Sequence, residues 1–148
     1  MEPVAEFVAG QLKEQFNMGY VYVEQHDYEK AKECFENVIT ICNVVQYEDA
    51  KRKAYISLAK LYVLKNDFVS SFKSSALAFS ESSDEYVNKQ AKEIIVKTLG
   101  MAMKYGVEAQ KKGDDKEALC IYKLALPFLK SPKKEVVQNE IKKLEITK

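Results

Sequence analysis

The sequence has little of what nucleic-acid-binding proteins use to hold phosphate. Its 23 lysine and arginine residues balance 22 aspartate and glutamate residues for a net charge of +1, and Arg52 is its single arginine. No excess of one sign steers the chain towards nucleic acid or anionic lipid. The bidentate guanidinium contacts that favour phosphate and base recognition are also nearly missing. We therefore expect no nucleic-acid partner.

Cysteines and long apolar runs are scarce too. The three cysteines, Cys34, Cys42 and Cys120, are odd in number and show no CxxC spacing, which argues against a disulfide framework and a zinc site. No apolar stretch is long enough to cross a bilayer, and the opening residues MEPVAEFVAG lack the basic flank of a signal peptide. We expect a cytoplasmic protein with no membrane span.

Residue patterns that support catalysis are also few. The one histidine, His26, lies beside Asp27 in a polar stretch, where an exposed turn residue is the simplest interpretation. Cys34 and Cys42 fall within a helical pattern, where buried, unreactive thiols are the default. The sequence shows no glycine-rich phosphate loop, no HExxH and no paired-carboxylate signature. We expect no catalytic residue, no metal and no cofactor, and hence no enzyme.

What the sequence does have is a helical period throughout its 148 residues, a length typical of one domain. Apolar residues recur three and four positions apart. The sequence lacks the alternating apolar runs joined by Asn-Gly or Asp-Gly turns that would indicate strands. Ser82 and Glu85 form a capping box before the fifth helix, in which Gly100 and Gly106 favour a kink or a division. The pattern predicts an all-α fold of about seven antiparallel helices, at about residues 3–25, 28–45, 48–65, 68–80, 83–112, 115–130 and 132–147.

A pair of small residues twelve positions apart recurs three times along the chain. A small residue at such a position lets two helices cross closely, and the aromatic residues around it fill the space between neighbouring helix pairs. In frames that start at Leu12, Arg52 and Leu99, the pairs are Gly19 with Ala31, Ala59 with Ser71, and Gly106 with Ala118.

In these residues the chain resembles the tetratricopeptide repeat (TPR) family, whose unit is a helix-turn-helix of about 34 residues. The frames start 40 and 47 residues apart, which indicates longer helices or connections than the family average. Gln15 and Ser75 depart from the family's bulky positions. The resemblance implies a single domain over residues 1–148 that forms a right-handed α-α superhelix, with repeats at about 12–47, 52–82 and 99–130 and a capping helix at 132–147.

Proteins of this family commonly bind a peptide on the concave face formed by the first helix of each unit. The family's clamp for terminal carboxylates is not expected, because Phe16, Tyr20 and Ser57 stand where it needs a lysine and two asparagines. In the alternative interpretation, Phe16, Tyr20 and Val23 pack against another helix. The concave positions carried over to this chain are Phe16, Asn17, Tyr20 and Val23, then Lys53, Ile56, Lys60 and Val63, then Met103, Lys104 and Val107.

The resemblance implies a non-catalytic adaptor or co-chaperone that binds a peptide or helix of another protein. The alternatives are a dedicated secretion or assembly chaperone, for which self-association would be a mark, and a structural subunit of a larger helical-repeat complex. Residues 91–147 are also similar to an MIT domain, a three-helix module that binds short helices of membrane-remodelling complexes. We favour the tetratricopeptide interpretation, because the two upstream repeats predict the same pattern without an MIT domain.

Overall fold

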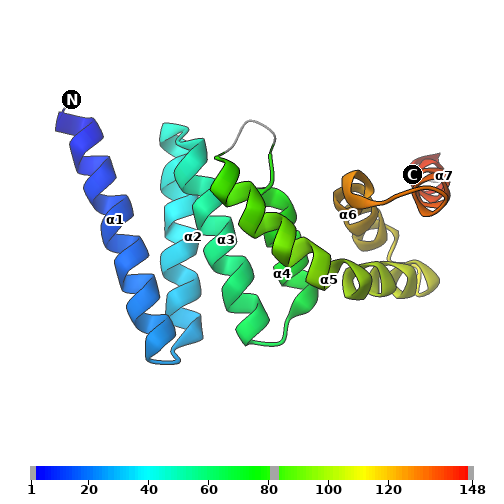
Figure 1. Cartoon of the computed structure of the whole chain (residues 1–148), viewed down its shortest axis with the longest axis horizontal. Helices are drawn as coiled ribbons and strands as arrows, with labels where there is room; N and C mark the ends of the chain where they lie inside the picture. The colour runs from blue at the N-terminus through cyan, green and yellow to red at the C-terminus, as the bar shows by residue number, and fades with distance from the viewer. Residues whose placement is uncertain (1–2, 81–83, 147–148) are drawn as a thin grey trace.

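The chain folds into helices throughout residues 3–80 and 84–146, which are the residues that the computed structural model describes (Figure 1). Successive helices run antiparallel and pack chiefly against the next helix along the chain. This arrangement of helix hairpins confirms the predicted all-α fold. The elements are α1 Pro3–Glu24, α2 Tyr28–Val45, α3 Glu48–Leu64, α4 Phe68–Ala78, α5 Glu85–Lys111, α6 Asp115–Ala125, a 3₁₀ turn at Leu126–Phe128 and α7 Lys133–Ile146.

The helix boundaries agree with the predicted ones within two residues, except at the end of the sixth helix. The sixth helix ends at Ala125 and not near residue 130, because Pro127 has no N–H to donate to the preceding turn. Leu126 keeps helical backbone angles and begins the 3₁₀ turn. The fifth helix begins at Glu85, with the side chain of Asp84 accepting a hydrogen bond from the Tyr86 N–H at 2.7 Å. Ser82 of the predicted capping box lies outside the described residues.

The connections α1–α2, α3–α4 and α5–α6 are three copies of one turn. Each has a residue with positive φ just after the helix: His26 (60°), Asn66 (59°) and Gly113 (84°). The next residue, Asp27, Asp67 or Asp114, donates its N–H to the carbonyl five residues back at 2.9 Å, and its side chain caps the following helix. These hydrogen bonds provide partners for backbone groups at the end of one helix and at the start of the next. The three turns are 40 and 47 residues apart, the same spacing as the sequence frames.

The positive φ at these turns gives a first testable prediction. A residue other than glycine is strained in this conformation by roughly 1 kcal/mol. His26→Gly is therefore expected to raise the thermal midpoint, and Gly113→Ala is expected to lower it. The exposed contact between His26 Nδ1 and the Tyr28 hydroxyl, at 3.0 Å, offsets part of the gain. Gln25→Gly, one residue earlier, is the control and should not stabilise. Calorimetry showing the opposite order would refute this reading of the turn.

Small residues do let the paired helices approach closely. A methyl group added to Gly19 would lie 2.5 Å from Phe35 Cε1, and one added to Gly106 would lie 3.1 Å from Ile121 Cγ2. In the middle hairpin the Ser71 hydroxyl, fully buried, donates to the Ala59 carbonyl at 2.8 Å. At Gly19, the nearest side-chain atoms belong to the ring of Phe35, one turn beyond the predicted partner Ala31.

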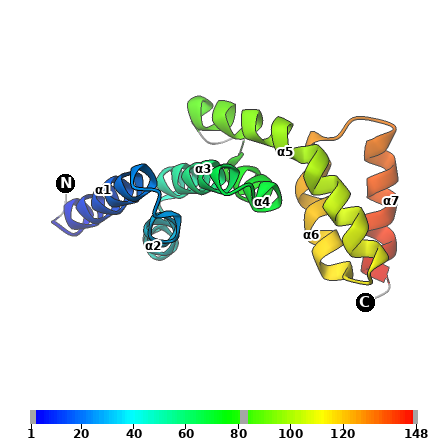
Figure 2. The same ribbon diagram turned by 90° about the horizontal axis from the view of Figure 1, so that it is seen from below.

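The long helix α5 changes direction partway along its length (Figure 2). The buried Thr98 hydroxyl donates to the Ile94 carbonyl at 2.8 Å, an interaction with the preceding turn that often bends helices. The part of α5 before the bend lies beside α3 and α4, and the part after it packs on α6 through Gly106. Figure 2 shows the result, since α6 and α7 stand beside the far half of α5.

Buried apolar residues continue along the whole stack. One cluster joins α3 to α7 and contains Phe72, Ile95 and Ile121, and two smaller clusters around Val38 and Phe35 hold α1, α2 and α3 together. The first helices of the hairpins also meet, α1 with α3 and α3 with α5. That row of first helices positions the candidate site.

Candidate functional site

Three pockets that share lining residues follow one another along α3, and together they are called the groove here. The central pocket, of about 250 Å³, lies where α1, α3 and α5 meet. The α1–α3 pocket, about 720 Å³, shares Phe16 and Lys53 with it, and the α3–α5 pocket, about 370 Å³, shares Lys60 and Gln90 with it. The central pocket is lined by Phe16 and Tyr20 of α1, by Lys53, Ile56, Ser57 and Lys60 of α3, and by Tyr86, Val87 and Gln90 of α5.

Two aromatic rings of α1 form one wall of the central pocket. Tyr20 is 48% exposed, and its hydroxyl hydrogen-bonds to Ser57 Oγ at 3.1 Å, which ties α1 to α3. The centroid of its ring lies 6.2 Å from that of Phe16 and 5.4 Å from that of the buried Phe35. The two rings therefore pack on the buried Phe35 on one side and are partly exposed on the other.

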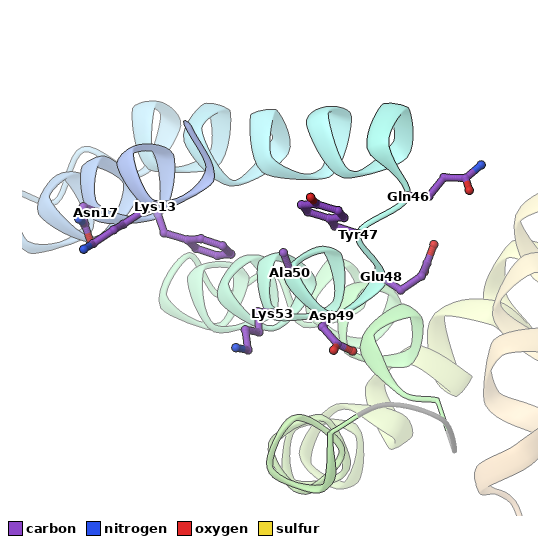
Figure 3. A pocket seen from close by; sticks show the side chains of 9 residues that line it. Lys13, Asn17, Gln46, Tyr47, Glu48, Asp49, Ala50 and Lys53 are labelled. Atoms are coloured by element: carbon purple, nitrogen blue, oxygen red, sulfur yellow. The ribbon is translucent and has the colours of Figure 1, made fainter. Parts of the chain in front are cut away.

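The α1–α3 pocket is bounded by α1, the connection between α2 and α3, and the first turns of α3 (Figure 3). Figure 3 shows Tyr47 and Ala50 between the α1 side chains and the charged residues of α3. Both signs of charge line this pocket, because Lys13 and Lys53 are balanced by Glu48 and Asp49. It therefore has room for a guest but no preference for one sign.

The central pocket, in contrast, carries only positive charge. Lys53 and Lys60 both line it, and neither forms an ion pair with any residue in the part of the chain that the structure describes. Both lysines are exposed at its rim, above the buried Ile56 and Ser57. An apolar floor under two unpaired ammonium groups suits a guest with an apolar side chain next to a carboxylate.

Most of the predicted concave residues line this groove, but four do not. Val23 packs in the cluster around Phe35, and Met103 is buried in the large core cluster. Lys104 and Val107 are exposed on α5 after its bend, beyond the residues that line the three pockets. The groove brings together Phe16, Asn17, Tyr20, Lys53, Ile56, Lys60 and Val63.

The repeat frame did not predict the contribution of α5 to the groove. Tyr86, Val87 and Gln90 precede Leu99, where the third repeat frame starts. The bend of α5 brings these earlier turns against α3. The sequence did hold one signal for this contribution: the predicted fifth helix begins well before Leu99, where the third repeat frame starts.

The groups considered for chemistry have ordinary structural surroundings. Cys34 and Cys42 are buried in α2, and burial raises the pKa of both thiols, which keeps them protonated. His26 lies in the first turn, outside the groove, and contacts the Tyr28 hydroxyl. Over residues 3–80 and 84–146, no group of histidine, cysteine or acidic side chains is arranged to hold a metal ion, and no helix is long and apolar enough to span a bilayer.

Comparison with known proteins found a match to a family model, and it lies in the first hairpin. Residues 15–44, which cover the end of α1, the first turn and most of α2, match the family model described as tetratricopeptide repeat. No curated protein and no solved structure matches the chain. Repeats of this family generally serve as non-catalytic protein-interaction modules. The first hairpin is therefore similar to a tetratricopeptide repeat over residues 15–44, within an all-α fold of successive helix hairpins.

Proposed function

We propose that this protein is a non-catalytic interaction module, an adaptor or co-chaperone that binds a peptide segment of another protein in the groove along α3. The observation that carries the proposal is the meeting of Phe16, Tyr20, Lys53 and Lys60, from two helices, around one central pocket. Apolar and aromatic anchors at the centre of an interface contribute most of the binding energy, and charged rims select the partner.

The composition of the central pocket supports a partner segment with an apolar side chain flanked by carboxylates. Its aromatic wall and Ile56 floor would cover the apolar side chain, while Lys53 and Lys60 would face the acidic groups. The three unpaired cysteines support a cytoplasmic location as part of the same proposal.

The proposal is tested with a charge-reversed groove. Lys53→Glu with Lys60→Glu is expected to weaken partner binding at least about tenfold, because the variant replaces attraction at the rim by repulsion. Both side chains are exposed and form no ion pair in the described part of the chain, so the thermal midpoint should stay near that of the wild type. Affinity capture from the source cell, quantified by mass spectrometry, identifies the proteins whose capture depends on the groove.

The matched control reverses two exposed lysines far from the groove, Lys116→Glu and Lys142→Glu on α6 and α7. The net charge of the two double variants is the same, so a nonspecific effect of charge would affect both equally. Equal loss in the two variants, or full retention of every specific partner by the groove variant, would rule out the proposed site. Binding should also weaken as ionic strength rises, since the rim lysines are exposed.

A further inference from the structure

The outer side of α1, away from α2 and α3, is an uncovered end of the helix stack (Figure 1). In the described parts of the chain, α1 packs on α2 and α3 and on no other helix. At the other end of the stack, α7 buries Val137, Ile141 and Leu144 and exposes mostly lysine, glutamate and amide side chains. A polar outer surface of this kind closes a repeat stack in water. On α1, in contrast, Met18 is 38% exposed and Val21 is 50% exposed.

The internal repeat shows how the corresponding side of α3 is used. His26 and Asn66 occupy the same position in the first and second turns and lie 40 residues apart. Each α1 residue therefore corresponds to the α3 residue 40 positions later. Four positions on the outer side of α1 define what we call the α1 outer face. They are Gly10, Glu14, Met18 and Val21, and their α3 counterparts are Ala50, Ala54, Leu58 and Leu61.

On α3, these positions hold the preceding helix α2. Leu58 and Leu61 belong to one buried cluster with Phe35 of α2, and Ala54 belongs to another with Val38. All three α3 side chains are at most 4% exposed, whereas their counterparts on α1 are all exposed. The positions that hold a helix in the second repeat are thus open in the first.

The α1 outer face has space for a helix. A hollow of about 380 Å³ lies over it, lined by Asn17, Met18, Val21, Tyr22 and Gln25. A methyl group added to Gly10 would meet nothing within 4 Å, and a residue without a side chain allows another helix backbone to come close. Of the residues that line the hollow, Asn17 alone also lines the groove. The two surfaces therefore lie side by side but are distinct.

Charge selects what the α1 outer face accepts. Glu14 stands where α3 has the buried Ala54, so a guest helix would meet a carboxylate in the middle of its contact. Glu6 and Glu24 stand beyond the two ends of the face and are also exposed. None of the three glutamates forms an ion pair with a residue in 3–80 or 84–146, which favours a basic guest. A second copy of α1 would bring three more carboxylates and is disfavoured.

We infer that the α1 outer face binds a basic amphipathic helix of another protein, which packs on α1 as α2 packs on α3. Its apolar side chains, including one in the position of Phe35, cover Met18 and Val21. Its lysine or arginine three residues later, in the position of Val38, meets Glu14. The helix stack thereby continues into the partner, which is a different mode of binding from a segment held in the groove.

The test is an NMR titration of the ¹⁵N-labelled protein with a helical peptide as long as α2, which has 18 residues. The probe, whose apolar residues and central lysine follow the α2 stripe, is Ser-Lys-Gln-Leu-Ala-Lys-Gln-Phe-Ala-Gln-Lys-Ala-Ala-Gln-Leu-Ala-Lys-Gln. The control exchanges the phenylalanine with the lysine three positions after it, so its composition and net charge are the same. The probe is expected to shift amide signals of α1 around Met18 and Val21. It should bind at least about fivefold more tightly than the control, which places lysine over these apolar side chains.

Two substitutions on α1 test the apolar contact and the charge contact separately. Val21→Gln should weaken the probe at least about fivefold, and Glu14→Lys should weaken it at least about tenfold by bringing like charges together. The matched variants on α2 are Val44→Gln, at a side chain that is 79% exposed, and Glu36→Lys, at another exposed position. Neither should change the affinity. Because all four side chains are exposed, every variant should keep a thermal midpoint near that of the wild type.

The variant with Lys53→Glu and Lys60→Glu should bind the probe at least as tightly as the wild type, which separates this surface from the groove. Equal binding of the probe and the exchanged control, or equal loss in Glu14→Lys and Glu36→Lys, would overturn the inference. Signal shifts confined to groove residues would overturn it too. Sedimentation velocity of the protein alone should show a monomer. A dimer that Val21→Gln dissociates would mean that a second copy covers the face, and not a helix of another protein.

Discussion

Replacing Phe35 with alanine is expected to lower the free energy of unfolding by about 3–5 kcal/mol, the usual cost of removing a fully buried aromatic ring. No part of the Phe35 side chain is exposed. Its ring lies against Gly19 and beside the rings of Phe16 and Tyr20, in one buried cluster with Leu58 and Leu61 of α3. The substitution therefore leaves a cavity at the place where α1, α2 and α3 meet.

Urea denaturation followed by circular dichroism measures this loss. Phe7→Ala is the matched control, because Phe7 is 67% exposed on α1 and its removal should change the free energy by less than about 0.5 kcal/mol. A Phe35→Ala variant within about 1 kcal/mol of the wild type would contradict the packing described for the first hairpin. Since Phe16 and Tyr20 rest on Phe35, the variant should also weaken a guest in the central pocket.

Much of the fold could be predicted because its signals are local. Asp27 and Asp67 each stand directly before a helix and cap it. The short polar turns that contain them therefore marked the helix boundaries in the sequence. The sixth helix was predicted too long because its apolar period continues past Pro127, although the missing N–H ends the helix. A kink or a division of the fifth helix was predicted from Gly100 and Gly106, and α5 does bend (Figure 2), but the direction of the bend has no local mark in the sequence.

The candidate site was predictable only where the repeat frame and the true geometry coincide. Phe16, Lys53 and Lys60 lie on α1 and α3, which follow the frame, and they meet around the central pocket. Met103 follows the frame too, but it lies beyond the bend of α5 and is buried in the core. A repeat frame fixes positions along a helix, whereas the direction of the helix depends on tertiary contacts. The resemblance of residues 91–147 to an MIT domain and the binding role of the groove stay predictions.

Replacing Gly19 with leucine is expected to lower the free energy of unfolding by about 3 kcal/mol, at the upper end of the usual cost of overpacking. The first added carbon alone would lie 2.5 Å from Phe35 Cε1 and 2.8 Å from Cζ. The ring cannot move away freely, because Phe35 is fully buried in its cluster with Ala31, Leu58 and Leu61. The helices α1 and α2 must therefore separate, which also displaces Phe16 and Tyr20 from the groove.

Gly100 provides the matched control for the change in helix propensity. A methyl group added there meets nothing within 4 Å, so Gly100→Leu should stabilise the exposed face of α5 by up to about 1 kcal/mol, the amount by which glycine disfavours a helix interior. If thermal unfolding places Gly19→Leu at or above the wild type, the close approach of Gly19 to Phe35 does not constrain the first hairpin.

Combining Gly19→Leu with Phe35→Ala separates overpacking from any other effect of the leucine. In this double variant the leucine side chain extends into the volume that the Phe35 ring vacates, so each change offsets part of the other. The total loss should fall below the sum of the two single losses by at least about 1 kcal/mol, since residues in direct contact couple by about 0.5–3 kcal/mol. Additive losses would mean that the introduced leucine and the Phe35 ring do not compete for the same space. A coupling of the expected sign would show that the missing side chain of Gly19 and the ring of Phe35 form one packing unit, which holds α1 against α2 and keeps the aromatic wall of the groove in place.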